Sequence, residues 1–272
     1  MLTNTFNYNG KKIFYRTQGS GPLIVLVHGF GEDGDIWKNQ FAIFPNRQLL
    51  VPDLPGSGRS EAIDNMTMEG LAGAVKELID EVNGHKNTTC TMIGHSMGGY
   101  VTLAFADKYG SVLNAFGLFH STAFADNDEK KESRRKGIAV MQEKGADAFL
   151  KTFVPGLYGP VTKDQRPEII DEHLAIVHNF SAQNLVKYFE AMMQRLDRTA
   201  VLQKSKVPVL FVMGAHDSAV PLEVSLKQCH LPSLAHIGLL QASGHCGMVE
   251  EVAEANKILI AFLNAVENIA QS

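Results

Sequence analysis

Ser96 is the residue whose surroundings most clearly suggest covalent chemistry. It stands at the centre of Gly-His-Ser-Met-Gly at 94–98, a G-x-S-x-G pattern that follows a β-type run and precedes a helical pattern. Small residues at both glycine positions permit a sharp strand-to-helix turn, in which the strained serine projects its Oγ outward. The turn also leaves the N–H of Met97 free at the helix start, where it can stabilise an oxyanion. The pattern predicts a nucleophilic serine, and an ordinary strand-to-helix turn is the alternative.

The sequence also supplies a base and a carboxylate, which a serine hydroxyl needs because it is a weak nucleophile by itself. Asp217 follows the apolar run 207–213, and His245 follows the run 236–241. Taken alone, Asp217 could be a turn-forming residue and His245 a helix-capping or core histidine. The chain order serine, aspartate, histidine, in register with the strand ends, instead favours a catalytic triad of Ser96, Asp217 and His245.

A second oxyanion donor is expected from a glycine-rich loop near the start of the chain. Residues 28–31, His-Gly-Phe-Gly, follow the continuous apolar run 23–27, which suits a buried strand. A loop after an early strand supplies this donor in serine sites of this order, which indicates the N–H of Phe30. We therefore expect the N–H groups of Phe30 and Met97 to form the oxyanion hole, with Gly29 among the substrate-binding residues.

The elements that position these groups alternate between strand and helix, which indicates a doubly wound α/β sheet. A hairpin around Asn9-Gly10 is expected at a sheet edge. Strands are expected at 23–27, 48–52, 89–93, 113–119, 207–213 and 236–241. Between 123 and 204 the strand-like runs give way to amphipathic helical stretches. We therefore expect a core domain over 1–122 and 206–272, with a mostly parallel central sheet flanked by helices, and an inserted helical cap over 123–205.

Three further residues are expected to bind substrate. His120 follows the last strand before the insertion, and Phe124 and Phe153 could line an apolar pocket beneath the cap. A satisfied structural histidine is the alternative for His120. Packing of the cap's own apolar face is the alternative for both phenylalanines.

Together these segments resemble the α/β-hydrolase superfamily, in particular its capped single-domain members, which include carboxylesterases and C–C hydrolases of ring-fission products. The resemblance covers essentially the whole chain and rests on residues 28–31, 53–60, 94–99, 214–217 and 244–245. It implies the fold, the triad and the oxyanion hole, and it implies that Asp53 and its glycine-rich loop brace the pocket. It does not indicate the substrate.

Three positions differ from neighbouring subfamilies. Haloalkane dehalogenases and related epoxide hydrolases have an aspartate nucleophile, whereas position 96 is serine. Many C–C hydrolases have tryptophan directly after the catalytic histidine, where this chain has Cys246. Enzymes like proline iminopeptidase have tryptophan near the elbow serine, where this chain has Met97. These differences disfavour the halide, epoxide and peptide reactions and weaken the C–C interpretation.

The motif residues and the family resemblance together predict one function and leave two alternatives. The expected function is a cofactor-independent serine hydrolase that cleaves a small or medium carboxylic ester, thioester or lactone through an acyl-enzyme. A C–C bond hydrolase would use the same triad on a vinylogous diketone. A hydrolase-like small-molecule sensor is the third interpretation, because the charged helix at 129–136 could present a surface to a partner.

Composition bears on partners and compartment. The 272 residues include 25 Lys and Arg against 29 Asp and Glu, a net charge of −4, and 45% are hydrophobic, as in a soluble globular protein. The basic run at 130–136 is interleaved with glutamates and is interpreted as a solvated helix face, so no nucleic-acid partner is expected. Apolar runs are too short to span a bilayer, so no membrane partner is expected, and the default compartment is the cytoplasm.

Neither a metal nor a cofactor is expected. The ten histidines show no H-E-x-x-H spacing, and neither a Walker pattern nor a dinucleotide-binding loop is identified. Cys90, Cys229 and Cys246 are widely spaced, and reduced thiols are expected. The expected partner is a small-molecule acyl substrate, and the chain is expected to be a monomer or a homodimer.

Overall fold

The chain opens with an antiparallel hairpin of β1 (Leu2–Tyr8) and β2 (Lys11–Gln18) in the computed structural model, which describes residues 1–84 and 88–271. Asn9 and Gly10 connect the strands, and both have positive φ, 50° and 82°, as a two-residue turn matched to strand twist requires. β1 is the edge strand of the sheet. The expected hairpin at a sheet edge is confirmed.

The described residues form an eight-stranded sheet in the order β1-β2-β4-β3-β5-β6-β7-β8. Its remaining strands are β3 (Leu23–Val27), β4 (Gln48–Pro52), β5 (Cys90–His95), β6 (Leu113–Phe119), β7 (Val209–Gly214) and β8 (Ala235–Leu240). β2 pairs antiparallel with β1 and β4, whereas all pairs from β4 to β8 are parallel. The parallel strands therefore direct their carboxyl ends toward one edge, where open sheets bind ligands.

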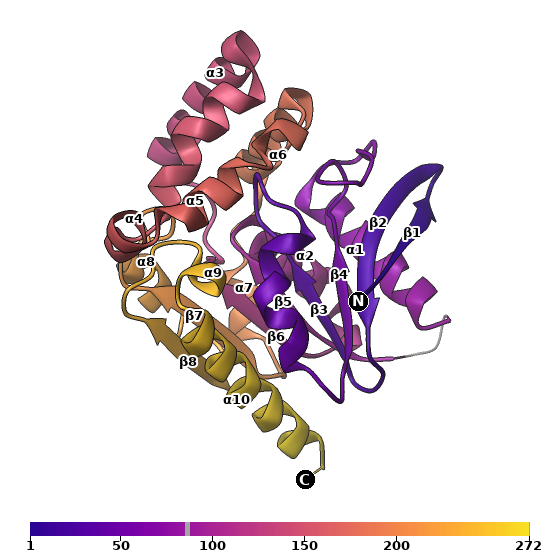
Figure 1. Ribbon diagram of the computed structural model, residues 1–272. Helices are drawn as coiled ribbons and strands as arrows, with labels where there is room; N and C mark the ends of the chain where they lie inside the picture. Colours follow the sequence, from indigo (N-terminus) through magenta and orange to yellow (C-terminus); the bar gives the residue numbers. More distant parts are fainter. Residues whose placement is uncertain (85–87, 272) are drawn as a thin grey trace.

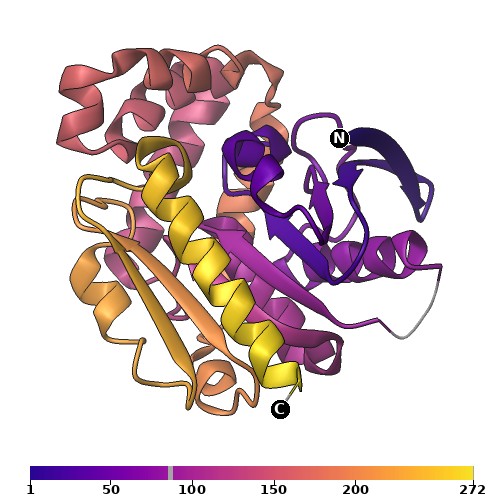
Figure 2. The same ribbon diagram turned by 60° about the horizontal axis from the view of Figure 1, so that its bottom comes forward.

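Helices cover both faces of this sheet. α1 (Met68–Val82) and α2 (Met97–Tyr109) pack together on one face, and α10 (Val252–Gln271) crosses the other beside the 3₁₀ helix η1 (Gly34–Ile43) and α9 (Gly247–Glu250) (Figure 2). Because both faces are covered, β3, β5 and β7 are buried along their whole length. The short elements η2 (Gly110–Val112) and α8 (Leu222–Leu226) lie in the connections beside β6 and β7.

The segment between β6 and β7 forms a separate group of helices above the carboxyl ends of the strands (Figure 1). It contains α3 (Asp128–Phe153), η3 (Val154–Leu157), α4 (Pro160–Gln165), α5 (Pro167–Leu174), η4 (Val177–Asn179) and α6 (Ala182–Gln194). α3 is broken at Gly145, where φ is 85°. α6 packs against α3 and buries residues at helical spacing, namely Leu185, Tyr188, Phe189 and Met192.

The end of this helical group differs from the expected boundary at residue 205. α7 (Thr199–Gln203) packs against α2 beside the sheet, although the expected cap included it. The reason is that Arg198 ties the start of α7 to that layer: its guanidinium pairs with Glu69 of α1 at 2.5 Å, and its N–H donates to the Ala123 carbonyl oxygen at 2.8 Å. None of the described helices is long and apolar enough to cross a membrane.

Candidate active site

Ser96 lies in the sharp turn between β5 and α2. Its φ of 51° and ψ of −117° are unusual for a residue other than glycine. The turn needs glycines, because a Cβ at Gly94 would lie 2.2 Å from the Gly98 carbonyl oxygen. β6 and the loop after it hold the backbone: Ser96 N–H donates to the Phe119 oxygen at 3.0 Å, and Ser121 Oγ donates to the Ser96 oxygen at 2.7 Å. The geometry is that of a nucleophile elbow, with the serine side chain partly accessible.

Asp217 and His245 meet after the carboxyl ends of β7 and β8. His245 Nδ1 lies 2.8 Å from Asp217 Oδ2, and the N–H groups of Ala219 and Val220 donate to Oδ1 at 2.9 and 2.8 Å. Burial raises the pKa of the Asp217 carboxyl, but His245 and the hydrogen bonds from His120 and His245 outweigh it and hold this pKa well below its ordinary value. Asp217 is therefore an acceptor at neutral pH, so the Nδ1 of His245 donates to it and Nε2 is the ring nitrogen that this pair leaves without a partner.

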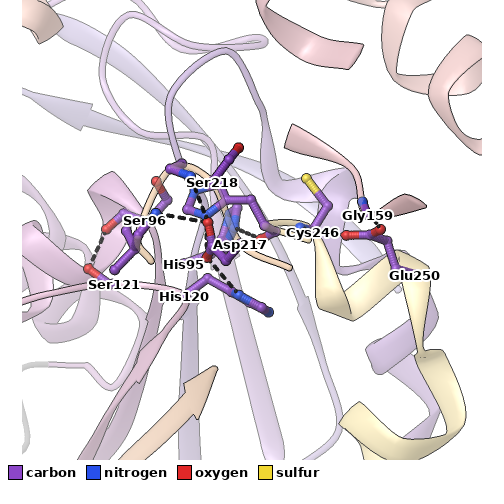
Figure 3. A network of polar contacts seen from close by, with 12 residues as sticks. His95, Ser96, His120, Ser121, Gly159, Asp217, Ser218, Cys246 and Glu250 are labelled. Atoms are coloured by element: carbon purple, nitrogen blue, oxygen red, sulfur yellow. Dashed lines mark hydrogen bonds and ion pairs between the residues drawn. The ribbon is translucent and has the colours of Figure 1, made fainter. Parts of the chain in front are cut away.

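His120 lies beneath this pair rather than on the substrate cavity, which differs from the expectation. Its Nδ1 is 3.0 Å from Asp217 Oδ2, and its side chain is fully buried (Figure 3). Burial lowers the pKa of His120 to about 4, so the ring is neutral and Nδ1 donates to the carboxylate. Its contacts make His120 an orienting group for Asp217, because that carboxylate and the loops around it separate the ring from the cavity.

A cavity of about 730 Å³ opens above Ser96, between the sheet and the group of helices. Ser96 and His245 both lie on its wall, as do Phe30 and Phe153. α3 and α6 supply much of the rest of the wall. Phe153 therefore lines the same cavity as Ser96, and its expected contact with substrate stays a prediction.

Phe124 lies on a neighbouring cavity of about 360 Å³ instead. The two cavities share Tyr100, Lys130, Ala219 and Val220 as lining residues, so only a narrow partition separates them. Thr122 Oγ1 accepts the N–H of Phe124 at 3.2 Å. Phe153 thus lines the cavity that contains Ser96, whereas Phe124 lines the neighbouring cavity.

The expected oxyanion donors flank the elbow. Met97 is the first residue of α2, so its N–H has no acceptor within the helix. The N–H of Phe30 has no hydrogen-bond partner among the described residues, and its ring is stacked on Phe189 with centroids 4.4 Å apart. Gly29 lies behind the site rather than on the cavity wall: a Cβ there would be 3.1 Å from the Ser96 Cβ. A larger residue would press on the nucleophile.

A buried ion pair lies directly behind the elbow. His95 Nδ1 is 2.9 Å from Glu32 Oε2, and His95 Nε2 is 2.9 Å from the carbonyl oxygen of His245. Both partners only accept hydrogen bonds, so both ring nitrogens donate and the ring is an imidazolium. Burial lowers the pKa of His95, but attraction to Glu32 and these hydrogen bonds raise it above 6.5. Burial raises the pKa of Glu32, yet His95 outweighs it and lowers that pKa to about 2.

This ion pair connects the segments that form the site. Glu32 Oε2 also accepts the N–H of Gly29 at 2.7 Å, which fixes the loop that presents Phe30. His95 belongs to the elbow itself and holds the backbone of His245. One buried pair therefore joins the loop at 28–31, the turn at Ser96 and the backbone of His245.

Known proteins share this chain's architecture and sequence pattern. The model of the alpha/beta hydrolase family matches residues 24–255. The chain belongs to the α/β-hydrolase family. This α/β hydrolase is 27% identical over 255 residues to a protein provisionally named carbamate hydrolase RutD from Pseudomonas savastanoi pathovar phaseolicola, covering 90% of the chain and 94% of that protein. It is 25% identical to lipase 1 of Psychrobacter immobilis, covering 95% of the chain and 83% of the lipase.

Solved structures agree with this assignment. A thermophilic esterase from Thermogutta terrifontis superposes on the α/β hydrolase with a TM-score of 0.90 and 25% identity, covering 98% of this chain and 99% of the esterase. The enol-lactonase of Burkholderia xenovorans superposes with a TM-score of 0.87 and 24% identity, covering 96% and 100% of the two chains. The expected fold, a mostly parallel sheet flanked by helices, is confirmed.

One cluster in this hydrolase has the composition of a metal site. His120, Asp217 and His245 each offer a ligand atom within 4.8 Å of the others. Both histidines, however, point Nδ1 at the carboxylate, so that the protons of the two rings occupy the space between the ligand atoms. The hydrogen bonds account for the cluster without an ion.

Residues 29–34, Gly-Phe-Gly-Glu-Asp-Gly, do have the spacing of a dinucleotide-binding loop, which the sequence analysis failed to identify. The segment follows β3, but it leads into a 3₁₀ helix instead of the long α-helix that holds a pyrophosphate. The buried carboxylate of Glu32 already accepts the N–H of Gly29, in the place of a phosphate oxygen. The loop is therefore built around its own anion.

Glu32 and His95 are the residues that sequence reasoning missed in this hydrolase. His95 lies inside the G-x-S-x-G pattern, which leaves the residue type at its position unspecified. Glu32 follows the oxyanion loop, and nothing in the linear sequence brings it to His95 across 63 positions. The signal that could have identified the pair is a polar residue next to each segment: His95 directly before Ser96, and Glu32 directly after the loop at 28–31.

Proposed function

We propose that this α/β hydrolase is a serine hydrolase that cleaves a carboxylic ester, thioester or lactone through an acyl-enzyme. The observation that carries the proposal is that Ser96 and His245 line one cavity, while Nδ1 of His245 is hydrogen-bonded to the Asp217 carboxylate at 2.8 Å. A serine, an oriented neutral imidazole and a buried carboxylate are the groups that acyl transfer requires.

The proposed reaction has two halves. Ser96 Oγ forms a bond to the substrate carbonyl carbon while its proton moves to His245 Nε2, and the N–H groups of Phe30 and Met97 bind the resulting oxyanion. The bond from carbon to the leaving oxygen or sulfur then breaks, and His245 returns the proton to that atom. Water attacks the acyl-enzyme with His245 as base, which releases the acid and restores the Ser96 hydroxyl.

We assign the orientation of His245 to Asp217, and that of Asp217 partly to His120. The imidazolium that forms during the reaction faces a carboxylate that accepts four hydrogen bonds: from His245, His120, Ala219 and Val220. These donors fix the carboxylate while it remains charged, so it stabilises the imidazolium without taking its proton.

The helices between β6 and β7 are proposed as the cap that encloses the substrate. α3 and α6 contribute Phe149, Phe153, Phe189 and Met192 to the cavity wall, which supplies apolar surface for the acyl group or leaving group. The segment 123–198 serves as the cap in this proposal, since α7 packs with the sheet layer.

Relatives support cleavage next to a carbonyl carbon with a heteroatom as leaving group. The similar proteins carry the names esterase, lipase, enol-lactonase and carbamate hydrolase. The first three names describe ester chemistry, and a carbamate also loses a heteroatom from its carbonyl carbon. This shared step favours an ester over the C–C bond of a ring-fission product.

Labelling with a fluorophosphonate probe tests the proposal, with Ser96→Ala as the variant and hydrolysis of p-nitrophenyl butyrate as the second readout. We expect wild type to be labelled and to hydrolyse the ester, and we expect the variant to do neither while its circular dichroism spectrum stays unchanged. Equal labelling of the two proteins would remove Ser96 from the mechanism. Absence of labelling in folded wild type, together with ligand-dependent capture of a partner, would favour the sensor.

A further inference from the structure

All the charged side chains that line the cavity above Ser96 are positive. Its charged lining residues are Lys130, Arg134, Lys136 and Lys144, all from α3, and no carboxylate is among its described lining residues. The chain as a whole has a net charge of −4, so this excess of cations runs against the overall balance. A cleft lined by charges of one sign focuses the electrostatic potential on its contents.

Only part of this charge is neutralised within the protein. Arg134 Nε donates to Asp126 at 2.6 Å, but Arg195 pairs with the same carboxylate at 2.8 Å, so one anion faces two guanidinium groups. Lys130 donates to the carbonyl oxygen of Ala219 at 2.6 Å, which leaves its charge uncompensated. The net charge of these residues is therefore positive even when their ion pairs and hydrogen bonds are counted.

Lys136 and Lys144 have neither an ion pair nor a hydrogen bond within the described part of the chain. Both side chains are exposed at the cavity, where a bound molecule can reach them. Lysine ammonium groups on flexible stems act as movable point charges, which suits a carboxylate on a substrate that varies in position.

The arrangement of charge along α3 follows the helical period. Lys130, Gly137 and Lys144 are seven residues apart and lie on one stripe, which faces the cavity. The acidic residues of the same helix are absent from the cavity lining; they are Asp128, Glu129, Glu132, Glu143 and Asp147. The cavity side of α3 therefore carries only cations, whereas all five acidic residues lie elsewhere on the helix, together with Lys131, Arg135 and Lys151.

We propose that the natural substrate carries a carboxylate in addition to the bond that is cleaved, and that this carboxylate lies along the cationic face of α3. The inference rests on the proposed function and specifies its substrate class as half-esters, acidic lactones or acidic thioesters. The ammonium groups of Lys136 and Lys144 bind the carboxylate, while Lys130 and Arg134 contribute to the positive field. The acyl carbonyl remains at Ser96.

Matched pairs of esters test this assignment. One pair carries the charge on the acyl side, mono-p-nitrophenyl pimelate against its methyl ester. The other carries it on the leaving group, para-acetoxybenzoate against para-acetoxybenzamide. The measured quantity is the ratio of kcat/KM for the anionic ester to kcat/KM for its neutral partner. The proteins are wild type, the double variant Lys136→Gln with Lys144→Gln, and the control Lys131→Gln with Arg135→Gln.

The control removes the same total charge from the same helix, at positions outside the cavity lining. We expect the ratio for at least one pair to fall about 5- to 25-fold in the Lys136/Lys144 variant, because each lost charge at short range in a solvated site is worth about fivefold. The ratio stays at the wild-type value in the control. Added salt at about 0.5 M lowers the wild-type ratio toward that of the variant, since it screens exposed charges.

Two results overturn the proposal, and they differ from each other. If wild type hydrolyses the neutral esters and all three proteins give the same ratio, the carboxylate does not bind to α3, and the serine mechanism stands. If wild type hydrolyses none of the esters and Ser96 is not labelled, the serine mechanism fails as well.

Discussion

Two buried histidine–carboxylate pairs lie next to each other beside Ser96, with the rings of His95 and His245 4.9 Å apart, and they have nearly the same geometry. On the cavity side His245 Nδ1 is 2.8 Å from Asp217, and behind the elbow His95 Nδ1 is 2.9 Å from Glu32. The two pairs differ in the surroundings of the other ring nitrogen, Nε2. Nε2 of His245 is left for the cavity, whereas Nε2 of His95 lies 2.9 Å from a backbone carbonyl oxygen.

In the proposed mechanism this difference separates a base, His245, from a fixed cation, His95. An imidazole with one nitrogen free has a lone pair that accepts the serine proton, whereas an imidazole between two acceptors must carry both protons. The comparison teaches that residue types and pair distances do not define a role. The chemical nature of the group facing the second nitrogen does.

The largest expected effect comes from breaking the cavity-side pair. Asp217→Asn keeps the size of the side chain but removes the acceptor that fixes the His245 tautomer. We expect kcat for p-nitrophenyl butyrate to fall about 10³- to 10⁴-fold, as in other triads that lose this carboxylate. Steady-state kinetics on the folded variant measures it. A kcat near the wild-type value would show that a different carboxylate orients His245.

The second prediction breaks the rear pair. Glu32→Gln keeps an acceptor for the Gly29 N–H but removes the anion that stabilises the His95 imidazolium. We expect kcat to fall about 10- to 100-fold with KM changed less than about twofold. The reason is that Ser96, His245 and the loop at 28–31 would shift relative to one another, while Glu32 and His95 themselves do not touch substrate. Glu61→Gln, at a carboxylate that accepts the N–H of Lys12 far from the site, is the matched control.

The pH dependence of that variant sharpens the comparison. Attraction to Glu32 raises the pKa of His95 in wild type, and the acceptors at both ring nitrogens hold the ring in its charged form. Without the carboxylate, we expect burial to dominate and to lower this pKa. The ratio of wild-type to variant kcat/KM therefore rises between about pH 5.5 and 7.5 as the variant loses its proton. A ratio independent of pH, or a neutral His95 ring in wild type by nitrogen NMR, would contradict this account.

A smaller effect is expected for His120. His120→Asn suits the positive φ of 49° at this position, which asparagine tolerates, but it shortens the donor that reaches Asp217. We expect kcat to fall about 3- to 10-fold, the value of one ordinary hydrogen bond, because the Asp217 carboxylate keeps its other donors. A loss as large as that of Asp217→Asn would place His120 in the reaction itself.

No effect is expected from removing metal ions. Incubation with EDTA followed by gel filtration should leave kcat within about twofold of the untreated protein, because His120 and His245 bind Asp217 through protonated nitrogens. Loss of activity that Zn²⁺ restores would overturn the interpretation of this cluster as part of a triad.

The sequence by itself determined the elements and the order of the reactive groups. The tight turn at Ser96 requires glycine at 94 and 98, because side chains there would collide with backbone. The elbow could therefore be predicted from the local residue types. Continuous apolar runs marked the buried strands, and Asp217 and His245 were found from their places after two of them. The hairpin turn at Asn9-Gly10 was predictable for the same local reason. The boundary of the helical group was not, because Arg198 of one segment binds Glu69 of another.

Only the tertiary structure decided what each histidine does and how charge is distributed around the cavity. Local sequence gives no distance between Glu32 and His95, and it did not show that His120 lies under Asp217 or that Phe124 lines a neighbouring cavity. The basic run of α3 is interpreted from sequence as a solvated face, since acidic and basic residues are interleaved along it. Folding places four of its cations on the cavity and no carboxylate, because a helix separates residues that are neighbours in sequence and brings together those one and two turns apart.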